Sequence, residues 1–415
     1  MTISSAARAY CAITVFLAGL GAAQAEAQNS SGIGTVEQGA PTAPGVPLGS
    51  FRLHPALTFY DGYDDNIYRT DTGLQDSFLV TINPALTLAS NWGRHKFEVN
   101  AELSQYLYRS VRDENHTNYV IGGGGQLQIA DGMAINGRAS YTATHELRTS
   151  EDLAAIAVTP TRYTILHADA DVVHARGRLS LRVGGRYDEY SFDPTKLLGG
   201  TLLDNRDRNR QIYEGYVKGD YEFSPGYSAF LRAAYDHRKY DLARDRNGID
   251  RNSDGYRIDA GVDMLLTRLI EGNAFAGYSI QRYNAPLGQI GGLDYGVKLT
   301  WYPTELLTVR LNGQRTIGET TIVNAAADDE KTISGEVSYA FRRDISLRAD
   351  VDYINDHYSG AGRTDETVQA GAGAKYVANE YMSFDLHYQH SRRTSPLTTF
   401  RYSDNTVMLG ISLHI

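Results

Sequence analysis

An acidic stretch near residue 60 gathers the side chains of this sequence that could most readily do chemistry. The segment FYDGYDDNIYRTD, residues 59–71, places Asp61, Asp64, Asp65 and Asp71 among three tyrosines. Carboxylates at this density suit a divalent cation or contacts to sugar hydroxyls. The alternative role is structural, because Asp and Asn side chains bond nearby backbone groups where a strand ends. This second role predicts a polar rim made of Tyr63, Asp64, Asp65, Asn66 and Tyr68.

A second acidic stretch, DRNSDG, occupies residues 250–255. Asp250, Asn252 and Asp254 match the first half of an EF-hand calcium loop. The twelfth position of such a loop requires Glu, and here it is Gly261, which excludes an EF-hand. A loosely bound calcium ion in an extracellular loop is the only cofactor that we consider, and a solvated polar loop is the alternative.

The sequence offers little for catalysis or for binding nucleic acid. Its single cysteine is Cys11, close to the N-terminus, so the rest of the chain has no thiol nucleophile and no Cys-based metal site. The histidines are scattered without the spacing of metal ligands. The net charge of -9 provides no basic surface for phosphates. We expect no catalytic residues and no nucleic-acid partner.

The N-terminal 50 residues predict two segments that precede the folded domain. Residues 1–25 resemble a cleaved signal peptide: Arg8 precedes an apolar run, and small residues place the cleavage after Ala25 or, alternatively, Ala27. Residues 26–50 are rich in Gly, Pro and Ser and predict a flexible periplasmic arm. Residues 51–415 then form one domain.

Strict alternation of apolar and polar side chains is the dominant pattern after residue 50. In ISLRADVDY, Ile345 and Leu347 lie on one face of the predicted strand, and Arg348 and Asp350 lie on the other. No stretch has the period of an amphipathic helix or the length of a transmembrane helix. The pattern predicts an all-β fold.

Three features favour a transmembrane barrel over a soluble sandwich. The polar faces are heavily charged, and many apolar faces end in an aromatic residue such as Tyr187, Trp301 or Tyr376. Short connections such as HARG and SPG alternate with long ones such as DLARDRNGIDRNSDG. Short periplasmic turns, longer extracellular loops and aromatic girdles are typical of outer-membrane barrels.

The segments predict a transmembrane antiparallel β-barrel of about 18 strands. They start near residues 52, 77, 95, 117, 132, 162, 178, 210, 227, 255, 271, 291, 306, 331, 344, 366, 381 and 403. Sixteen is the alternative count if the segments near 162 and 210 are not strands. An even number places both termini in the periplasm.

The polar faces of these strands supply the candidate lumen lining. The candidates are Arg182, Arg186, Arg232, Arg257, Arg310, Arg348, Glu98, Glu102, Asp259, Asp263, Asp294, Glu336, Asp350 and Asp385. Rings of one sign would predict ion selectivity, whereas this mixture of signs suits neutral or weakly charged sugars. The alternative is that these charges pair across strands and stiffen the wall.

The segments LHPALTFYDGYDDNIYRT and DSFLVTINPALTLAS resemble the opening of a known family. The family is the second type of outer-membrane β-barrel porins, an exopolysaccharide-associated group. Matching features are Pro55, the stretch from Tyr63 to Tyr68, the Pro84-Ala85-Leu86 sequence and the later YTATHELRTSED. The resemblance covers essentially the whole mature chain. It implies a barrel in a Gram-negative outer membrane that carries polymer beside a periplasmic export partner.

The function that we expect is a passive conduit for exopolysaccharide export, working with periplasmic export proteins. A general or sugar-selective diffusion porin is the first alternative, and a plugged barrel serving as a surface adhesin or anchor is the second. Other expected partners are outer-membrane lipid and the barrel-assembly machinery, which would recognise the last strand, VMLGISLHI, although Ile415 replaces the usual final aromatic. The transported species, the oligomeric state and any plugging of the pore by loops or by the N-terminal arm stay open.

Overall fold

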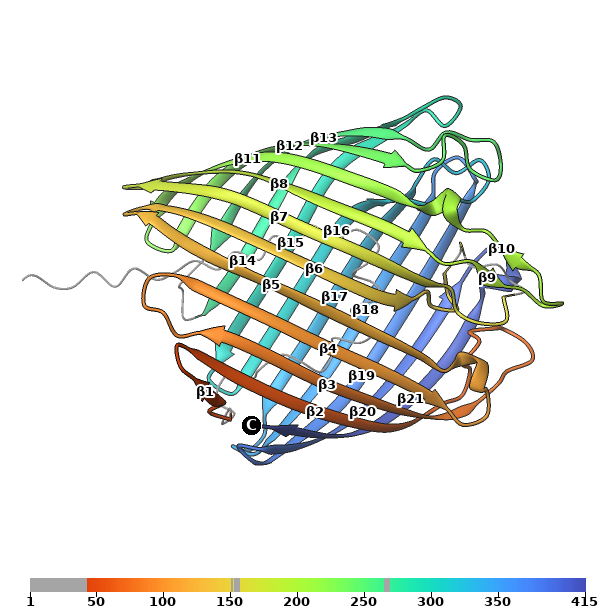
Figure 1. Ribbon diagram of the computed structural model, residues 1–415, viewed down its shortest axis with the longest axis horizontal. Coiled ribbons are helices and arrows are strands. Elements are labelled where there is room, and N and C mark those ends of the chain that lie inside the picture. The colour runs from red at the N-terminus through yellow and green to blue at the C-terminus, as the bar shows by residue number, and fades with distance from the viewer. Residues whose placement is uncertain (1–42, 151, 153–156, 265–268) are drawn as a thin grey trace, which may run out of the picture.

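The barrel is closed by antiparallel pairing all the way round. The structure, a computed structural model, describes residues 43–150, 152, 157–264 and 269–415, so the predicted signal peptide lies outside it. Within these residues one sheet has nineteen strands: β1 (Val46–Leu48) is a short addition to the edge of β2, and the other eighteen form the barrel (Figure 1). Each strand pairs with the next along the chain, and β2 pairs with β21 to close the ring.

The spanning strands are β2 (Phe51–Asp64), β3 (Ser77–Ser90), β4 (Lys96–Tyr108), β5 (His116–Ala130), β6 (Met133–His145), β7 (Arg162–Arg176), β8 (Leu179–Phe192), β11 (Arg210–Ser224), β12 (Tyr227–Tyr240), β13 (Ser253–Met264), β14 (Ile270–Tyr283), β15 (Gln289–Thr304), β16 (Leu307–Gly318), β17 (Asp328–Ala340), β18 (Ile345–Tyr358), β19 (Arg363–Asn379), β20 (Met382–Thr394) and β21 (Tyr402–His414). A two-stranded hairpin, β9 (Thr195–Lys196) with β10 (Leu202–Leu203), and three short 3-10 turns, η1 (Arg112–Glu114), η2 (Arg206–Arg208) and η3 (Thr398–Phe400), lie in the connections.

The predicted fold class and strand count are confirmed. Every spanning strand begins within three residues of its predicted start, and both doubtful segments are strands, β7 and β11. The strands have 12 to 17 residues, more than the ~9–11 that a tilted membrane crossing needs. The extra length lies where neighbouring strands continue their hydrogen-bonded ladder beyond the membrane and into the loops.

The alternation along each strand separates an apolar outer face from a polar inner face. Leu231 on β12 and Ile258 on β13 are 61% and 60% exposed, whereas the next residue of each strand, Arg232 and Asp259, is buried. Arg232 and Asp259 lie directly opposite each other in the ladder, so both point to the same side. In a membrane, exposed apolar side chains face lipid and the polar ones face the lumen.

Aromatic side chains gather near both ends of the outer face. Towards the long loops, the rings of Tyr187 and Tyr213 lie 5.2 Å apart, as do those of Tyr235 and Tyr256. Towards the short turns, Tyr376 stacks on Phe384 at 6.2 Å, and Trp92 stacks on Phe97. These two belts agree with the interfacial girdles of an outer-membrane barrel.

The two ends of the barrel differ in the length of their connections. At one end the turns are as short as residues 131–132, 177–178 and 225–226, and glycines with positive φ (Gly132, Gly177 and Gly226) allow the tight reversal. The C-terminus and β1 lie at this end, and β9 and β10 lie at the other (Figure 1). No helix among the described residues is long and apolar enough to span a membrane.

The end of the expected flexible arm has a defined structure. We expected residues 26–50 to be flexible, but Val46–Leu48 pairs with Phe51–Leu53 as a hairpin. Gly49, with a φ of +62°, supplies the left-handed residue that this short turn needs. Among the arm residues that the structure describes, the chain therefore lies against the first spanning strand.

Candidate functional site in the barrel lumen

The candidate lumen residues alternate with exposed apolar residues and therefore face inward. Most of the charges pair with a neighbour: Arg232 donates to Asp259 at 2.6 and 2.9 Å. Arg257 lies between Glu214, at 3.3 Å, and Asp294, at 3.7 Å. The remaining pairs are Arg310–Glu336, Arg348–Asp350, Arg182–Asp171 and Arg186 with Asp188 and Glu214. The lining thus supports the pairing alternative across much of the wall.

Four candidates are not among the pairs just named: Glu98, Glu102, Asp263 and Asp385. Glu98 and Glu102 are exposed on the inner face of β4, and Asp385 on β20 lies opposite Gly410 and Lys375 in its neighbours. Sequence reasoning also missed a partner, Lys218, which donates to Asp263 at 2.6 Å. Its position four residues after Glu214, on the same face of β11, was the signal that could have identified it.

The wall is chemically uneven around the ring. From β2 to β6 many inner positions carry hydroxyls or amides, beside the carboxylates of Glu98 and Glu102. Examples are Thr58, Thr81, Asn100, Asn118 and Ser140. The charged pairs concentrate instead on β7 to β18. The inner wall therefore has more hydroxyls and amides on β2 to β6 and more paired charges on β7 to β18.

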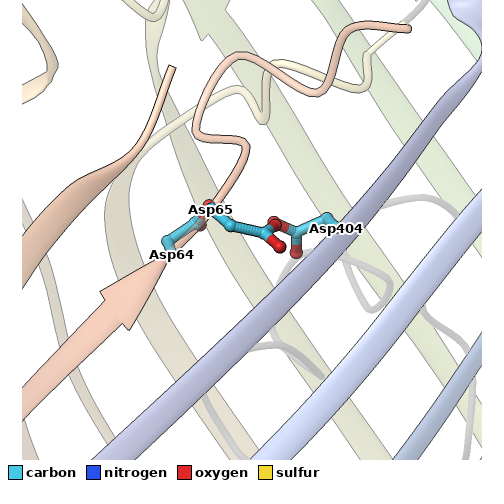
Figure 2. Close-up of side chains that lie close together, drawn as sticks. All are labelled: Asp64, Asp65 and Asp404. Carbon is cyan, nitrogen blue, oxygen red and sulfur yellow. The ribbon is translucent and has the colours of Figure 1, made fainter. Parts of the chain in front are cut away.

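The predicted polar rim ties the first strand to the last. Asp64, Asp65 and Asp404 come together where β2 leaves the barrel beside β21 (Figure 2), with carboxylate oxygens within 4.8 Å of one another. Arg69 lies among them and pairs with Asp64, at 3.3 Å, and with Asp404. Asp65 accepts hydrogen bonds from the backbone and side chain of Asn405, both at 2.7 Å.

The other rim residues strengthen the same junction. The Asn66 amide is fully buried and donates to the carbonyls of Thr70, at 2.7 Å, and of Ser403, at 2.9 Å. Tyr63 lies on the outer face and donates to Asp76 at 3.0 Å, while Tyr68 lies under the Arg148 guanidinium. We call Asp64, Asp65, Asn66, Arg69 and Asp404 the seam clasp. A guanidinium already supplies positive charge there, which favours the structural role.

The DRNSDG residues do not converge on one point. Asp250 accepts from the Asn284 side chain at 2.8 Å, and Asn252 accepts from the backbone of Tyr240 at 2.7 Å. Asp254 lies within β13, where it accepts from Tyr235 and His237. Calcium binding by this segment stays a prediction, and the three side chains are used in three separate local contacts.

Thr149 and Asp152, two described residues between β6 and β7, make contacts on other sides of the barrel mouth. Asp152 accepts hydrogen bonds from the hydroxyl of Thr320 at 3.2 Å and from the backbone and hydroxyl of Thr321 at 2.9 and 2.8 Å. Thr149 accepts from Arg393 of β20 at 2.6 Å. In the ring order, Thr320 and Thr321 lie between β16 and β17, on the far side from β6. We call these contacts the mouth bridge.

Other long loops pack beside the mouth bridge. Arg208, between β8 and β11, pairs with Glu146. Arg251, which is 2% exposed, pairs with Asp245 at 2.7 Å and donates to the carbonyls of Thr320 and Ala325. Tyr358 and Asp365, towards the same end of β18 and β19, have no exposed surface. The described parts of the long loops therefore pack against one another at this end of the barrel.

A cavity of about 160 Å³ lies along the inner wall from β8 to β16. Its lining combines arginines and acids with aromatic and amide side chains. Examples are Arg186, Tyr190, Arg210, Glu214, Lys298 and Asn312. Most of its wall consists of strand residues, whose positions are fixed by the hydrogen-bonded register of the sheet.

Solved structures of similar shape come from outer-membrane proteins. OpdK of Pseudomonas aeruginosa is 12% identical, with a TM-score of 0.44 over 88% of this chain and 98% of that chain. OccAB4 of Acinetobacter baumannii is 11% identical, with a TM-score of 0.45 over 88% and 98%. P. aeruginosa OccK2 (OpdF), solved in complex with glucuronate, is 11% identical, with a TM-score of 0.46 over the same shares. No curated protein matches the chain.

The family comparison covers the whole described barrel. A family model described as "Putative beta-barrel porin 2" matches residues 40–415, which include all eighteen spanning strands. This match agrees with the closed antiparallel barrel and with its apolar outer face. The chain therefore belongs to the beta-barrel porin 2 family of outer-membrane porins.

Proposed function

We propose that this porin is a passive, non-enzymatic diffusion channel for small hydrophilic solutes, among which hydroxylated compounds such as sugars pass best. Both chain termini face the periplasm in this proposal, and the long loops face outward. The observation that carries it is the mouth bridge, in which Asp152 contacts Thr320 and Thr321 on the far side of the ring. A bridged mouth admits small molecules and restricts large ones.

The size of the barrel supports a channel. Barrels of roughly 16–18 strands leave an aqueous lumen, whereas eight strands are filled by their own side chains. The paired charges on the wall form no ring of one sign, so they give little reason for strong ion selectivity. The hydroxyls and amides from β2 to β6 can bond the hydroxyls of a passing solute.

Export of exopolysaccharide with periplasmic export proteins, which the sequence resemblance implies, receives less support. A polymer in transit occupies the mouth continuously, so the Asp152 contacts and the Thr149–Arg393 contact would have to break throughout export. An adhesin or anchor requires no conducting path at all. The presence and the size limit of a path therefore separate these three functions.

Liposome swelling with solutes of graded size tests the proposal. Purified protein in liposomes should admit galactose and lactose quickly and exclude maltoheptaose. Rapid entry of maltoheptaose would favour the polymer conduit. No swelling with any solute would contradict both transport functions and favour the anchor.

A further inference from the structure

Arg210 differs from the other arginines that line the lumen cavity. Arg186, Arg238 and Arg257 pair with carboxylates that also line it, and Arg315 pairs with Asp329 at 2.5 Å. Among the described residues, the Arg210 guanidinium has one hydrogen bond, from Nη1 to the Arg208 carbonyl at 3.1 Å. Its Nε is buried without a hydrogen-bond partner.

Each acid of the cavity already pairs with an arginine other than Arg210, and the five acids share three arginines. Glu214 lies 3.3 Å from Arg257 and 3.5 Å from Arg186. The remaining pairs are Asp188 with Arg186, Asp236 with Arg238, Asp294 with Arg257 and Glu319 with Arg238. Among the described residues, Arg210 therefore has no carboxylate of its own within ion-pair distance.

The Arg210 side chain is held in a fixed orientation. Its guanidinium lies over the Tyr190 ring, 4.2 Å from the centroid, and within 5.8 Å of the Phe192 ring. Tyr190 is the cross-strand neighbour of Arg210, and both point into the lumen. Stacking fixes the plane of the guanidinium, and a planar fork with free N–H groups matches a carboxylate in two hydrogen bonds.

Two amides and a lysine lie elsewhere on the same cavity wall. Asn273, Lys298 and Asn312 occupy one row across β14, β15 and β16, and all three line the cavity. Lys298 makes no ion pair with a described residue, so it is a second cation of the lining without a carboxylate partner. Amides in this arrangement can bond the hydroxyls of a sugar ring.

We propose that this cavity is a subsite for a small hydroxylated solute carrying one carboxylate, a sugar acid, with Arg210 as the residue that binds the carboxylate. The proposal rests on the proposed function, because it names the solutes that the channel should favour. The carboxylate accepts hydrogen bonds from Nη2 and from the remaining N–H of Nη1 of Arg210, and the row of Asn273, Lys298 and Asn312 orients the rest of the molecule.

Isothermal titration with D-galacturonate and D-galactose tests the subsite in detergent, without any need for conductance. The two sugars differ at one carbon, which carries a carboxylate in the first and a hydroxyl in the second. At pH 7 the wild-type protein should bind galacturonate more tightly than galactose. Arg210→Gln should weaken galacturonate about tenfold, as expected for the loss of a charge-assisted hydrogen bond, and should leave galactose unchanged.

Two further variants make the result specific. Arg206→Gln removes an exposed arginine that pairs with Asp204 in the preceding loop, and it should bind both sugars as the wild type does. Arg210→Lys keeps the charge without the planar fork and should give a smaller loss, which keeps the test decisive if Arg210→Gln does not fold. Equal binding of the two sugars, or unchanged galacturonate binding in both Arg210 variants, would overturn the subsite. Failure of the swelling experiment would instead contradict the channel itself.

Discussion

Arg232 and Asp259 illustrate what single residues contribute to the wall. Asp259 has no exposed surface, and Arg232 donates two hydrogen bonds to one of its oxygens. The Phe275 ring lies 4.9 Å from the guanidinium and shields the pair further. A buried pair of this kind contributes little net stability over two apolar residues, but the loss of one partner leaves an uncompensated charge.

Removal of one partner of this ion pair should therefore destabilise the barrel more than removal of both partners. We expect Arg232→Met to lower the free energy of unfolding by about 3–5 kcal/mol, because Asp259 stays buried without its cation. Arg232→Met combined with Asp259→Leu should recover most of this loss. Urea unfolding followed by heat-modifiable gel migration measures both. A double variant as unstable as the single one would contradict the uncompensated-charge explanation.

A second residue-scale prediction concerns pH and the outer loops. Burial alone would raise the pKa of Asp207. The hydrogen bonds and the positive charge of Arg246 lower this pKa by more than burial raises it, so the pKa lies below its ordinary value. A carboxyl with a depressed folded pKa stabilises the fold above its unfolded pKa of about 3.9 and loses that contribution as the pH falls through the lower folded value.

Asp207→Asn should consequently loosen the contact between loops 193–209 and 241–252 only where Asp207 is ionised. Hydrogen exchange of residues 241–250 should be faster in the variant than in the wild type at pH 6. The two proteins should converge at the lowest pH, where the wild-type carboxyl is protonated too. Identical exchange at pH 6 would show that the Asp207–Arg246 pair does not hold the loop.

The strands of this barrel can be predicted from the local alternation of apolar and polar residues, whereas the packing of its loops cannot. The two-residue period of ISLRADVDY and of VMLGISLHI places β18 and β21 almost to the residue, because a one-residue shift would turn every apolar side chain into the lumen. The mouth bridge depends on contacts such as Asp152 with Thr320, which lie 168 residues apart in the chain. No local pattern in either loop encodes that partnership.

The acidic rim is a similar case, because its residues were predicted but its partners were not. Asp64 and Asp65 were expected to bond local backbone, and Asp64 does accept from the Asn66 backbone at 2.8 Å. The partners from β21, Asp404 and Asn405, come from the other end of the chain. Only closure of the ring brings the first and last strands together.

The seam clasp predicts that an arginine, and not a metal ion, balances the rim acids. Arg69→Ala should destabilise the barrel by about 3 kcal/mol, because it exposes the buried carboxylates of Asp64 and Asp404 to each other without a cation. EDTA should leave the melting temperature of the wild-type protein unchanged. A drop in melting temperature with EDTA that calcium reverses would instead indicate a metal site. Arg109→Ala, on the exposed residue after β4, is the matched control.

At the scale of the whole molecule, the two ends of the barrel differ, because the long loops gather at one end and the short turns at the other. The short-turn end has tight two-residue reversals, while loops of up to seventeen residues contact one another at the other end. In the proposed function, the strands give the channel its width, the loops limit the size of the solutes, and the lumen chemistry selects among the solutes small enough to enter.

Single-channel current in planar bilayers, compared between the wild type and Asp152→Ala, tests this account most directly. The variant removes the three hydrogen bonds that Asp152 accepts from Thr320 and Thr321 and so releases one end of the mouth bridge. Asp113→Ala, on an exposed loop residue, serves as the control. We predict small, steady openings for the wild type and the control, and clearly larger openings for Asp152→Ala. No current from the wild type, or equal currents from all three proteins, would contradict the account.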